Sequence, residues 1–231
     1  MSYVIFRNVS TASLGDVYVS EMPSHKKAGK RMTEYYVKGR DGALHVDEGY
    51  SNFDLTLKLV LVNASVDKRQ IVNAWADGTG KLITSDDPSR CYMASVKEEV
   101  RWKRTQANQG FYDTATITFN CQPFMYEAVD TVIELTESAE ILNPGSADSM
   151  PLIKVEGVGN VDFTFAGYPI QIADMSADSP VFIDCENGYV YTASGAATMV
   201  GEIPSLQMGV NSIAFGSNVS KITVTPRWRW V

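Results

Sequence analysis

The sequence contains little of what catalysis and covalent cross-linking usually require. Only three cysteines and two histidines occur in 231 residues. Cys91, Cys121 and Cys185 are an odd number with wide gaps, so we expect three free thiols in or near a β-core and no disulfide framework. His25 and His45 lie far apart beside loop-forming residues, which predicts solvent-exposed histidines and neither a metal cage nor a nucleophile with its base.

Long apolar runs and a positive charge balance are also absent. No window reaches the roughly 18 apolar residues that a membrane helix requires, and residues 1–16 have no basic flank before an apolar run. These patterns predict a soluble protein made in the cytosol, with no membrane partner. The formal charge of −7 disfavours a protein that grips DNA by neutralising phosphates, although an acidic protein can line a channel through which DNA slides.

Local motifs for enzyme chemistry and nucleotide binding are missing. The glycines within 77–80 and 157–159 lack a Lys-Ser or Lys-Thr continuation and open no helix, so we expect turns and not phosphate loops. No Gly-x-Ser-x-Gly elbow occurs. Residues 85–90, with Asp86 and Asp87 before a proline, are interpreted as a turn in preference to a cation site. The sequence therefore predicts no enzyme, no cofactor and no bound metal.

What the sequence does have is a succession of short strand signals. Runs rich in Val, Ile, Thr, Tyr and Phe recur along most of the chain, bounded by Gly, Pro, Asn or Asp. In residues 52–62, Phe and Leu alternate with Asp54, Thr56 and Lys58, as a strand with one solvated face requires. The clearest runs are residues 3–6, 35–38, 52–62, 91–100, 115–121, 131–135, 152–156, 161–165, 181–184, 190–192, 211–215 and 221–225. The pattern predicts an all-β fold.

One helix is expected to interrupt the strands, over residues 66–76. Ser65 is a suitable N-cap, and Gly78 follows the end. Ile71, Val72 and Trp75 share one stripe at helical spacing, so the helix should lie across a sheet.

The length is sufficient for two modest β-domains or one large one, and we favour two. The strand that ends at Cys121 is followed by Pro123, and the next clear strand begins a new pattern. We therefore predict domains at residues 1–126 and 127–231. The short, closely spaced strands of the second indicate a compact sandwich.

Two basic segments are candidates for assembly contacts. Residues 22–31 are polar and basic without a strand pattern, which indicates a mobile loop or arm, or alternatively an ordinary solvated hairpin loop. If residues 221–231 are extended, both arginines face one way and both tryptophans the other. This segment either offers cations to an acidic partner or forms an internal strand with solvated arginines; the acidic balance disfavours a base-stacking site. The candidate contact residues are His25, Lys26, Lys27, Lys30, Arg31, Arg227 and Arg229.

Taken together, these segments resemble the distal tail proteins of long-tailed phages that infect Gram-positive bacteria. The likeness is a series of short motifs in the same order along nearly the whole chain. In the second half the motifs lie in residues 151–159, 181–188, 204–213 and 222–230, and in the first half in residues 39–42, 75–92 and 119–124.

The resemblance implies an N-terminal β-sandwich or barrel, related to tail-tube subunits, that assembles into a hexameric ring, and a C-terminal galectin-like β-sandwich outside it. The ring would join the tail tube protein to the tail-associated hub protein at the baseplate, with DNA only passing through its lumen. The outer domain could anchor receptor-binding proteins. Such a protein would be synthesised in the host cytoplasm and reside in the virion, and residues 22–31 would reach a neighbouring subunit.

Two other functions remain open. A carbohydrate-binding module could recognise the bacterial cell wall, but the chain has no inserted sugar-binding module. Outside Trp228 and Trp230 its C-terminal half also has no tryptophan to stack on a sugar. A β-fold hydrolase using Asp86, Asp87 or His45 has no supporting motif.

Overall fold

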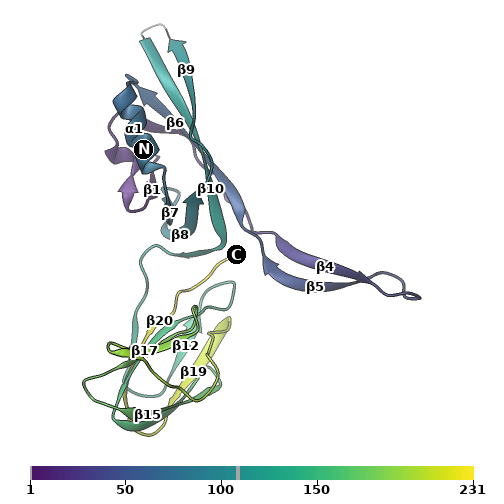
Figure 1. The fold of residues 1–231 in the computed structure, drawn as a ribbon, viewed down its shortest axis with the longest axis vertical. Helices are drawn as coiled ribbons and strands as arrows, with labels where there is room; N and C mark the ends of the chain where they lie inside the picture. The colour runs from purple at the N-terminus through teal and green to yellow at the C-terminus, as the bar shows by residue number, and fades with distance from the viewer. Residues whose placement is uncertain (1, 108–109) are drawn as a thin grey trace. The chain divides into compact units, whose positions relative to one another are not determined.

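The computed structural model describes residues 2–107 and 110–231 and consists mostly of β-strands (Figure 1). The chain divides into two compact units, one ending at Ala128 and the other running from Val129 to Trp230. One α-helix occurs among the described residues, so the predicted all-β class with a single helix is confirmed.

The first unit is organised around one antiparallel sheet, the large sheet. In the described part of the chain its strand order is β2-β1-β7-β8-β10-β6-β3, with β9 also pairing with β10. A 3-10 helix, η1 (Thr11–Ser13), lies between β2 and β3. The strands of the large sheet are β1 (Val4–Phe6), β2 (Val9–Ser10), β3 (Val17–Glu21), β6 (Phe53–Val62), β7 (Thr79–Thr84), β8 (Asp87–Val96), β9 (Arg101–Ala107) and β10 (Gly110–Glu127).

The pairing of β6 with β10 runs through the middle of this sheet. Their register extends from Phe53 opposite Cys121 to Val62 opposite Tyr112. The leucines of β6 are buried on one face, and the polar residues between them are exposed on the other. The alternation predicted for residues 52–62 is therefore confirmed, because every second side chain of a strand points to the same face.

Helix α1 (Val66–Trp75) packs on the apolar side of the first unit. The Oγ of Ser65 accepts a hydrogen bond from the Lys68 N–H at 3.3 Å, which confirms the predicted N-cap. Val72 and Trp75 are buried, and the Trp75 ring meets Phe119 edge-on with ring centroids 6.1 Å apart. The predicted stripe was wrong at Ile71, which is 49% exposed. Successive residues of a helix are about 100° apart around its axis, so Ile71 faces solvent while Val72 is buried.

A separate hairpin, the arm, is formed by β4 (Lys30–Tyr36) and β5 (Ala43–Tyr50). These strands pair with each other, and no third strand joins them within residues 2–107 and 110–231 (Figure 1). The expectation that residues 22–31 lack a strand was wrong at its end, since β4 already begins at Lys30. The expected strand at residues 35–38 was placed too late, and β5 was not predicted.

The second unit, described without gaps, contains two antiparallel sheets. The β13 sheet has the order β11-β20-β13-β16-β17-β18, and the β14 sheet has the order β12-β19-β14-β15. The strands are β11 (Ile133–Leu135), β12 (Ala139–Asn143), β13 (Leu152–Gly157), β14 (Gly159–Phe165), β15 (Tyr168–Met175), β16 (Val181–Asp184), β17 (Tyr189–Thr192), β18 (Gly195–Ala196), β19 (Gly209–Phe215) and β20 (Val219–Thr225).

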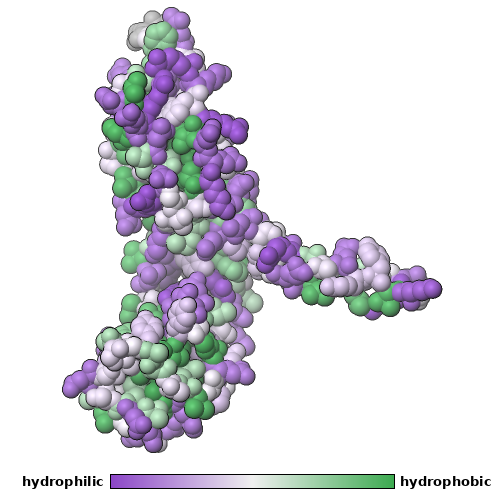
Figure 2. Space-filling view, viewed as in Figure 1, coloured by the Kyte–Doolittle hydropathy of each residue, from purple (hydrophilic) through white to green (hydrophobic). Residues whose placement is uncertain are grey.

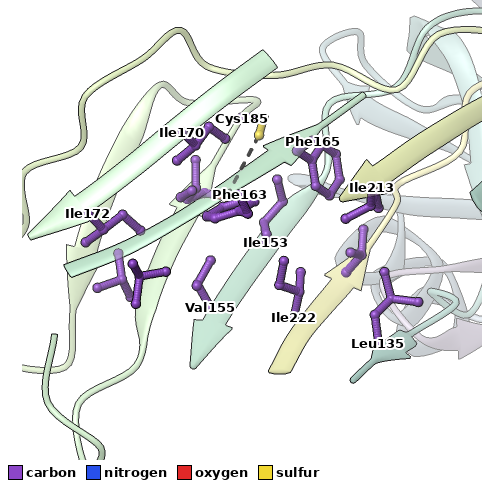
Figure 3. Packing of buried hydrophobic residues seen from close by; sticks show 14 of the residues in the cluster. Leu135, Ile153, Val155, Phe163, Phe165, Ile170, Ile172, Cys185, Ile213 and Ile222 are labelled. Atoms are coloured by element: carbon purple, nitrogen blue, oxygen red, sulfur yellow. Dashed lines mark hydrogen bonds between the residues drawn. The ribbon is translucent and has the colours of Figure 1, made fainter. Parts of the chain in front are cut away.

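The core of the second unit lies between these two sheets. Phe163 and Phe165 from the β14 sheet join Ile153 and Ile222 from the β13 sheet in one buried cluster (Figure 3). Inward-pointing side chains alternate with outward-pointing ones along each strand, as packing of two sheets face to face requires. Cys185 is part of this cluster, and all three cysteines are buried and free, as predicted.

Some strand boundaries were misjudged from sequence. The turn expected over residues 85–90 occupies only residues 85–86, and β8 begins at Asp87. β8 also ends at Val96, short of the expected residue 100. Strands β2, β3, β9, β12, β15 and β18 were not predicted, and most of them are short or rich in polar residues, which weakens the strand signal.

Replacement of Phe119 tests the core of the first unit. Phe119 is completely buried and meets Phe6 edge-on at 5.0 Å, so Phe119→Ala should lower the free energy of unfolding by about 3–5 kcal/mol. Phe111→Ala on the same strand removes a ring that is largely exposed and should cost less than about 1 kcal/mol. Denaturant unfolding of both variants checks this; equal losses would contradict the packing described.

Candidate functional site

The arm exposes an apolar face that no described residue of the first unit covers. Tyr35 lies opposite Leu44 and Thr33 opposite Val46, so these four side chains share one face. Tyr35, Leu44 and Val46 are each exposed, and Figure 2 shows hydrophobic surface along the arm. The opposite face is mixed, with charged side chains such as Glu34 beside the exposed Met32 and Tyr36. An isolated hairpin is at best marginally stable in water, so this face is suited to packing against another surface.

The loop that leads into the arm holds three of the predicted contact residues. His25 Nε2 lies 2.6 Å from Asp86 Oδ2, and the Lys26 ammonium donates to the Asp54 carbonyl at 3.0 Å. Lys27 is exposed. Sequence reasoning placed Asp86 in a turn, and the structure adds that its carboxylate anchors the loop through His25.

The other two basic residues of this segment lie on the arm itself. The Lys30 ammonium pairs with the Asp47 carboxylate, and this hydrogen bond raises the pKa of Lys30. Arg31 donates to the Glu48 carbonyl at 2.7 Å. Both cations therefore pair β4 with β5 across the hairpin, which was not foreseen because β5 was not predicted.

The two C-terminal arginines are engaged within the second unit. Arg227 Nη1 lies 2.7 Å from Asp184 Oδ1 and 3.1 Å from Glu186 Oε2. Burial opposes the charge on Arg227, but the hydrogen bond and charge of Asp184, together with the charge of Glu186, outweigh burial and raise the pKa of the guanidinium. The Arg229 guanidinium donates to the Asp148 carbonyl. Both arginines thus have partners inside their own unit.

The C-terminal segment is less regular than the sequence suggested. β20 ends at Thr225, as predicted for the strand of residues 221–225. Arg227 has a φ of +53°, so residues 226–231 do not continue it as one extended strand. Trp228 is buried in the core, and Trp230 packs partly against it.

The second face of the large sheet is solvated and rich in hydroxyl groups. Thr114, Thr116 and Thr118 of β10 alternate with buried residues. Across the pairing with β6, Thr118 lies opposite Thr56 and Thr116 lies opposite Lys58. These side chains present hydrogen-bonding groups over a wide, regular surface. Such a surface contacts water favourably and offers little apolar area to a partner.

A buried carboxylate joins helix α1 to the β9–β10 hairpin. The Asp113 side chain is completely buried, with Arg69 Nε 2.6 Å from its Oδ2 and Arg104 Nε 3.0 Å from its Oδ1. Burial alone would raise the pKa of Asp113, but the hydrogen bonds and charges of the two arginines outweigh it and hold this pKa below its ordinary value.

Neighbouring contacts reinforce this junction. Trp102 Nε1 donates to Asn73 Oδ1 at 3.0 Å, and the Arg69 guanidinium lies 5.9 Å from the Trp102 ring centroid. Sequence reasoning missed the junction because the strand was predicted to begin at Ala115. The available signal was Asp113 itself, a charged residue in phase with the buried positions of the same strand.

Groups suited to catalysis or metal binding are sparse. Burial raises the pKa of the Cys121 and Cys185 thiols to about 12, so both stay protonated and poorly nucleophilic at neutral pH. Within the described residues, no group of three or more His, Cys, Asp or Glu is placed to hold a metal ion.

In the second unit a cleft of about 730 Å³ lies beside β15, with Ile172 and Met175 among its apolar lining and Asp162 and Gln171 among its polar lining. No aromatic side chain lines it. No helix in the described part of the chain is long and apolar enough to cross a membrane.

Comparison with known proteins gives a match in fold. No protein-family model and no curated protein matches this chain. The crystal structure of the SPP1 Dit protein (gp 19.1), described as a paradigm of the hub adsorption apparatus in phages that infect Gram-positive bacteria, matches with a TM-score of 0.78 and 14% identity, covering 100% of both chains. This chain has the fold of SPP1 Dit. The resemblance to distal tail proteins that the sequence suggested is thereby confirmed at the level of fold.

Two structures of the phage P2 baseplate in its activated conformation, one with calcium and one with strontium, give weaker matches. Their TM-scores are 0.47 and 0.45, with identities of 11% and 10%. They cover 96% of this chain and 97% and 98% of the matched chains. The fold assignment therefore rests on the Dit structure alone.

The buried carboxylate predicts a specific pH dependence. Because the pKa of Asp113 is lowered on folding, its ionised form stabilises the protein at neutral pH, and that contribution is lost as the pH falls below about 3.8. Asp113→Asn should cost about 2 kcal/mol of unfolding free energy near pH 7, since both arginines lose a charged partner. The difference between variant and wild type should shrink as the pH falls toward about 2.

Denaturant unfolding across this pH range measures the effect. Thr118→Ala, at an outward position of the same strand, is the matched control and should differ from wild type by a constant amount, because threonine does not titrate. A constant difference for Asp113→Asn as well would contradict the stabilising role of the carboxylate.

Proposed function

We propose that this chain is a structural component of a phage tail tip, a ring-forming distal tail protein that connects the tail tube to the hub and its receptor-binding machinery. The observation that carries this proposal is the full-length fold match to SPP1 Dit, at a TM-score of 0.78. The match covers both units, so it supports a role of the whole chain. In this proposal residues 1–126 are the ring-forming domain and residues 127–231 are an outer, galectin-like domain.

The arm is the element proposed to join neighbouring copies. Its apolar face of Tyr35, Leu44 and Val46 is bordered by one charge, the Glu48 carboxylate that accepts a hydrogen bond from Thr33. The apolar side chains would become buried if the face lay against the next subunit. In a closed ring every arm finds an identical acceptor, so no apolar face remains exposed. The arm of this proposal is therefore the β4–β5 hairpin, with the basic loop that contains His25, Lys26 and Lys27 at its base.

The hydroxyl-rich face of the large sheet is proposed to line the central hole. Thr56, Thr114, Thr116 and Thr118 offer many weak hydrogen bonds, and Lys58, Arg101 and Lys103 stand beside them on the same face. The threonines contact DNA without neutralising its phosphates, which leaves these three cations as the groups that would slow its passage. The other proposed partners are the tail tube protein and the tail-associated hub protein, with receptor-binding proteins on the outer domain.

In this role the protein is made in the host cytoplasm, resides in the virion and carries no catalytic function. Its contribution is mechanical: identical contacts close a ring whose two faces meet different partners. Permanent interfaces of this kind usually bury more than about 2,000 Å² and have an apolar centre.

Electron microscopy of the purified full-length protein tests the ring directly. We expect class averages with a central hole, and a native mass that is a multiple of the 25.4 kDa chain, six copies being the proposed number. Incorporation into phage tails should follow. A protein that stays monomeric at high concentration and is absent from virions would overturn the proposal.

A charge introduced into the apolar face of the arm tests how the ring is held. Leu44→Arg places a cation in the apolar face and should convert the ring to monomers, because a buried, unpaired charge costs several kcal/mol per interface. Tyr36→Arg is the matched control. It places the same side chain on the opposite face of the arm, beside Glu34, and should leave the ring intact.

Size-exclusion chromatography with light scattering distinguishes these outcomes, and circular dichroism verifies that both variants stay folded. Rings that persist in Leu44→Arg would show that the arm's apolar face is not the subunit contact.

A further inference from the structure

An aromatic cluster lies on the outer face of the β13 sheet in the second unit. Tyr189 and Tyr191 occupy alternate positions of β17 and point to the same face, where they are 65% and 37% exposed. Phe182 of β16 lies directly opposite Tyr191. We call these three residues the aromatic platform. The remaining inward positions of both strands pack toward the core, so the platform is distinct from it.

The platform is rigid before any partner binds. The rings of Phe182 and Tyr191 are stacked, with centroids 5.2 Å apart and planes inclined by only 13°. Both residues belong to paired central strands, so their backbone is fixed by hydrogen bonds. Binding of a ligand to these rings would therefore cost little conformational entropy, because the side chains beneath it are already ordered.

Charged and hydroxyl-bearing side chains surround the rings on the same face. Asp184 lies opposite Tyr189, and Lys154 lies opposite Phe182, with Thr223 on the far side of Lys154. The network extends to Glu156, whose carboxylate pairs with Lys154. The Asp184 carboxylate is fully engaged: it accepts hydrogen bonds from the backbone N–H groups of Glu186 and Asn187, from the Asn187 amide and from Arg227. The Lys154 ammonium has three N–H donors and uses one on Glu156, so it can still donate to a ligand.

The combination of aromatic rings with charged and hydroxyl-bearing side chains favours one class of ligand. A broad apolar protein surface would desolvate the ion pairs around the rings, which costs free energy that no new polar contact offsets. A nucleic acid would bring phosphates toward the carboxylates of Asp184 and Glu156, which repel them. A pyranose sugar fits both parts: its C–H face lies on an aromatic ring, whose face is electron-rich, and its hydroxyl groups hydrogen-bond to carboxylates and amines at the rim.

We propose that the aromatic platform is a binding site for pyranose oligosaccharides, with Tyr189 and Tyr191 as stacking residues and Lys154 as a hydrogen-bonding residue. Two tyrosines at alternate positions of a strand are about 7 Å apart, so they form an extended surface that suits a chain of sugars better than a single one. The site does not depend on ring formation, because all its residues lie within one unit of one chain.

Titration of the full-length protein with soluble glycans tests this site. The probes are an N-acetylglucosamine trimer, a glucose trimer and solubilised wall polysaccharide from Gram-positive cells, followed by calorimetry and by NMR shifts. We expect saturable binding of at least one probe. Tyr189→Ala should weaken it about tenfold, as expected for the loss of one stacked ring, and Tyr189→Phe, which keeps the ring, should retain it.

Controls separate a lost site from a lost fold. Tyr36→Ala removes a tyrosine of the first unit that is even more exposed than Tyr189, and this variant should bind the glycan as the wild type does. An unchanged thermal midpoint of Tyr189→Ala verifies that the sandwich is intact. The proposal is overturned if the wild type binds none of the probes, or if Tyr189→Ala and Tyr191→Ala bind as well as wild type. It is also overturned if these variants lose only a protein partner from assembled tails.

Discussion

The pairing of β6 with β10 is the constraint on which the first unit depends. Its register sets Leu55, Leu57 and Leu59 on the same side as Ile117 and Phe119, so one face of the large sheet must be covered. Helix α1 supplies that cover through Val72 and Trp75. A slip of one residue would turn the leucines to solvent and place the threonines against the helix, which the burial of apolar surface strongly opposes.

The same register explains why a charge is tolerated in the interior. Asp113 is held at an inward position by the pairing of Asp113 with Leu61, so it cannot turn to solvent without breaking the strand. Arg69 from the helix and Arg104 from β9 supply the compensating charge. Their contact fixes the helix against the hairpin, and a buried carboxylate that lost these partners would be strongly destabilising.

The two units differ in how completely their own residues bury their apolar side chains. The second unit closes its core between two sheets, and its one exposed aromatic cluster is surrounded by charges. The arm of the first unit does not close: two strands cannot form a second layer by themselves, so the face of Tyr35, Leu44 and Val46 stays exposed within the chain. This contrast is the physical basis for proposing self-assembly for the first unit and recognition for the second.

Sequence patterns could predict the elements that have a regular period. The alternation in residues 52–62, the N-cap at Ser65 and the buried, free cysteines are confirmed, because each depends on local geometry or on composition. The strand β5 was missed because Ala43–Tyr50 mixes charged and apolar residues on a hairpin whose faces are both solvated. The roles of Lys30 and Arg31 were missed with it, since their partners lie on that strand.

The sequence by itself therefore determined the class of fold, the single helix and the resemblance to distal tail proteins. Only the tertiary structure decided which side chains meet across strands: His25 with Asp86, Arg227 with Asp184, and Phe182 with Tyr191. The reason is that periodicity depends on neighbours a few residues apart, whereas these contacts join residues brought together by strand order and register, which no local pattern encodes.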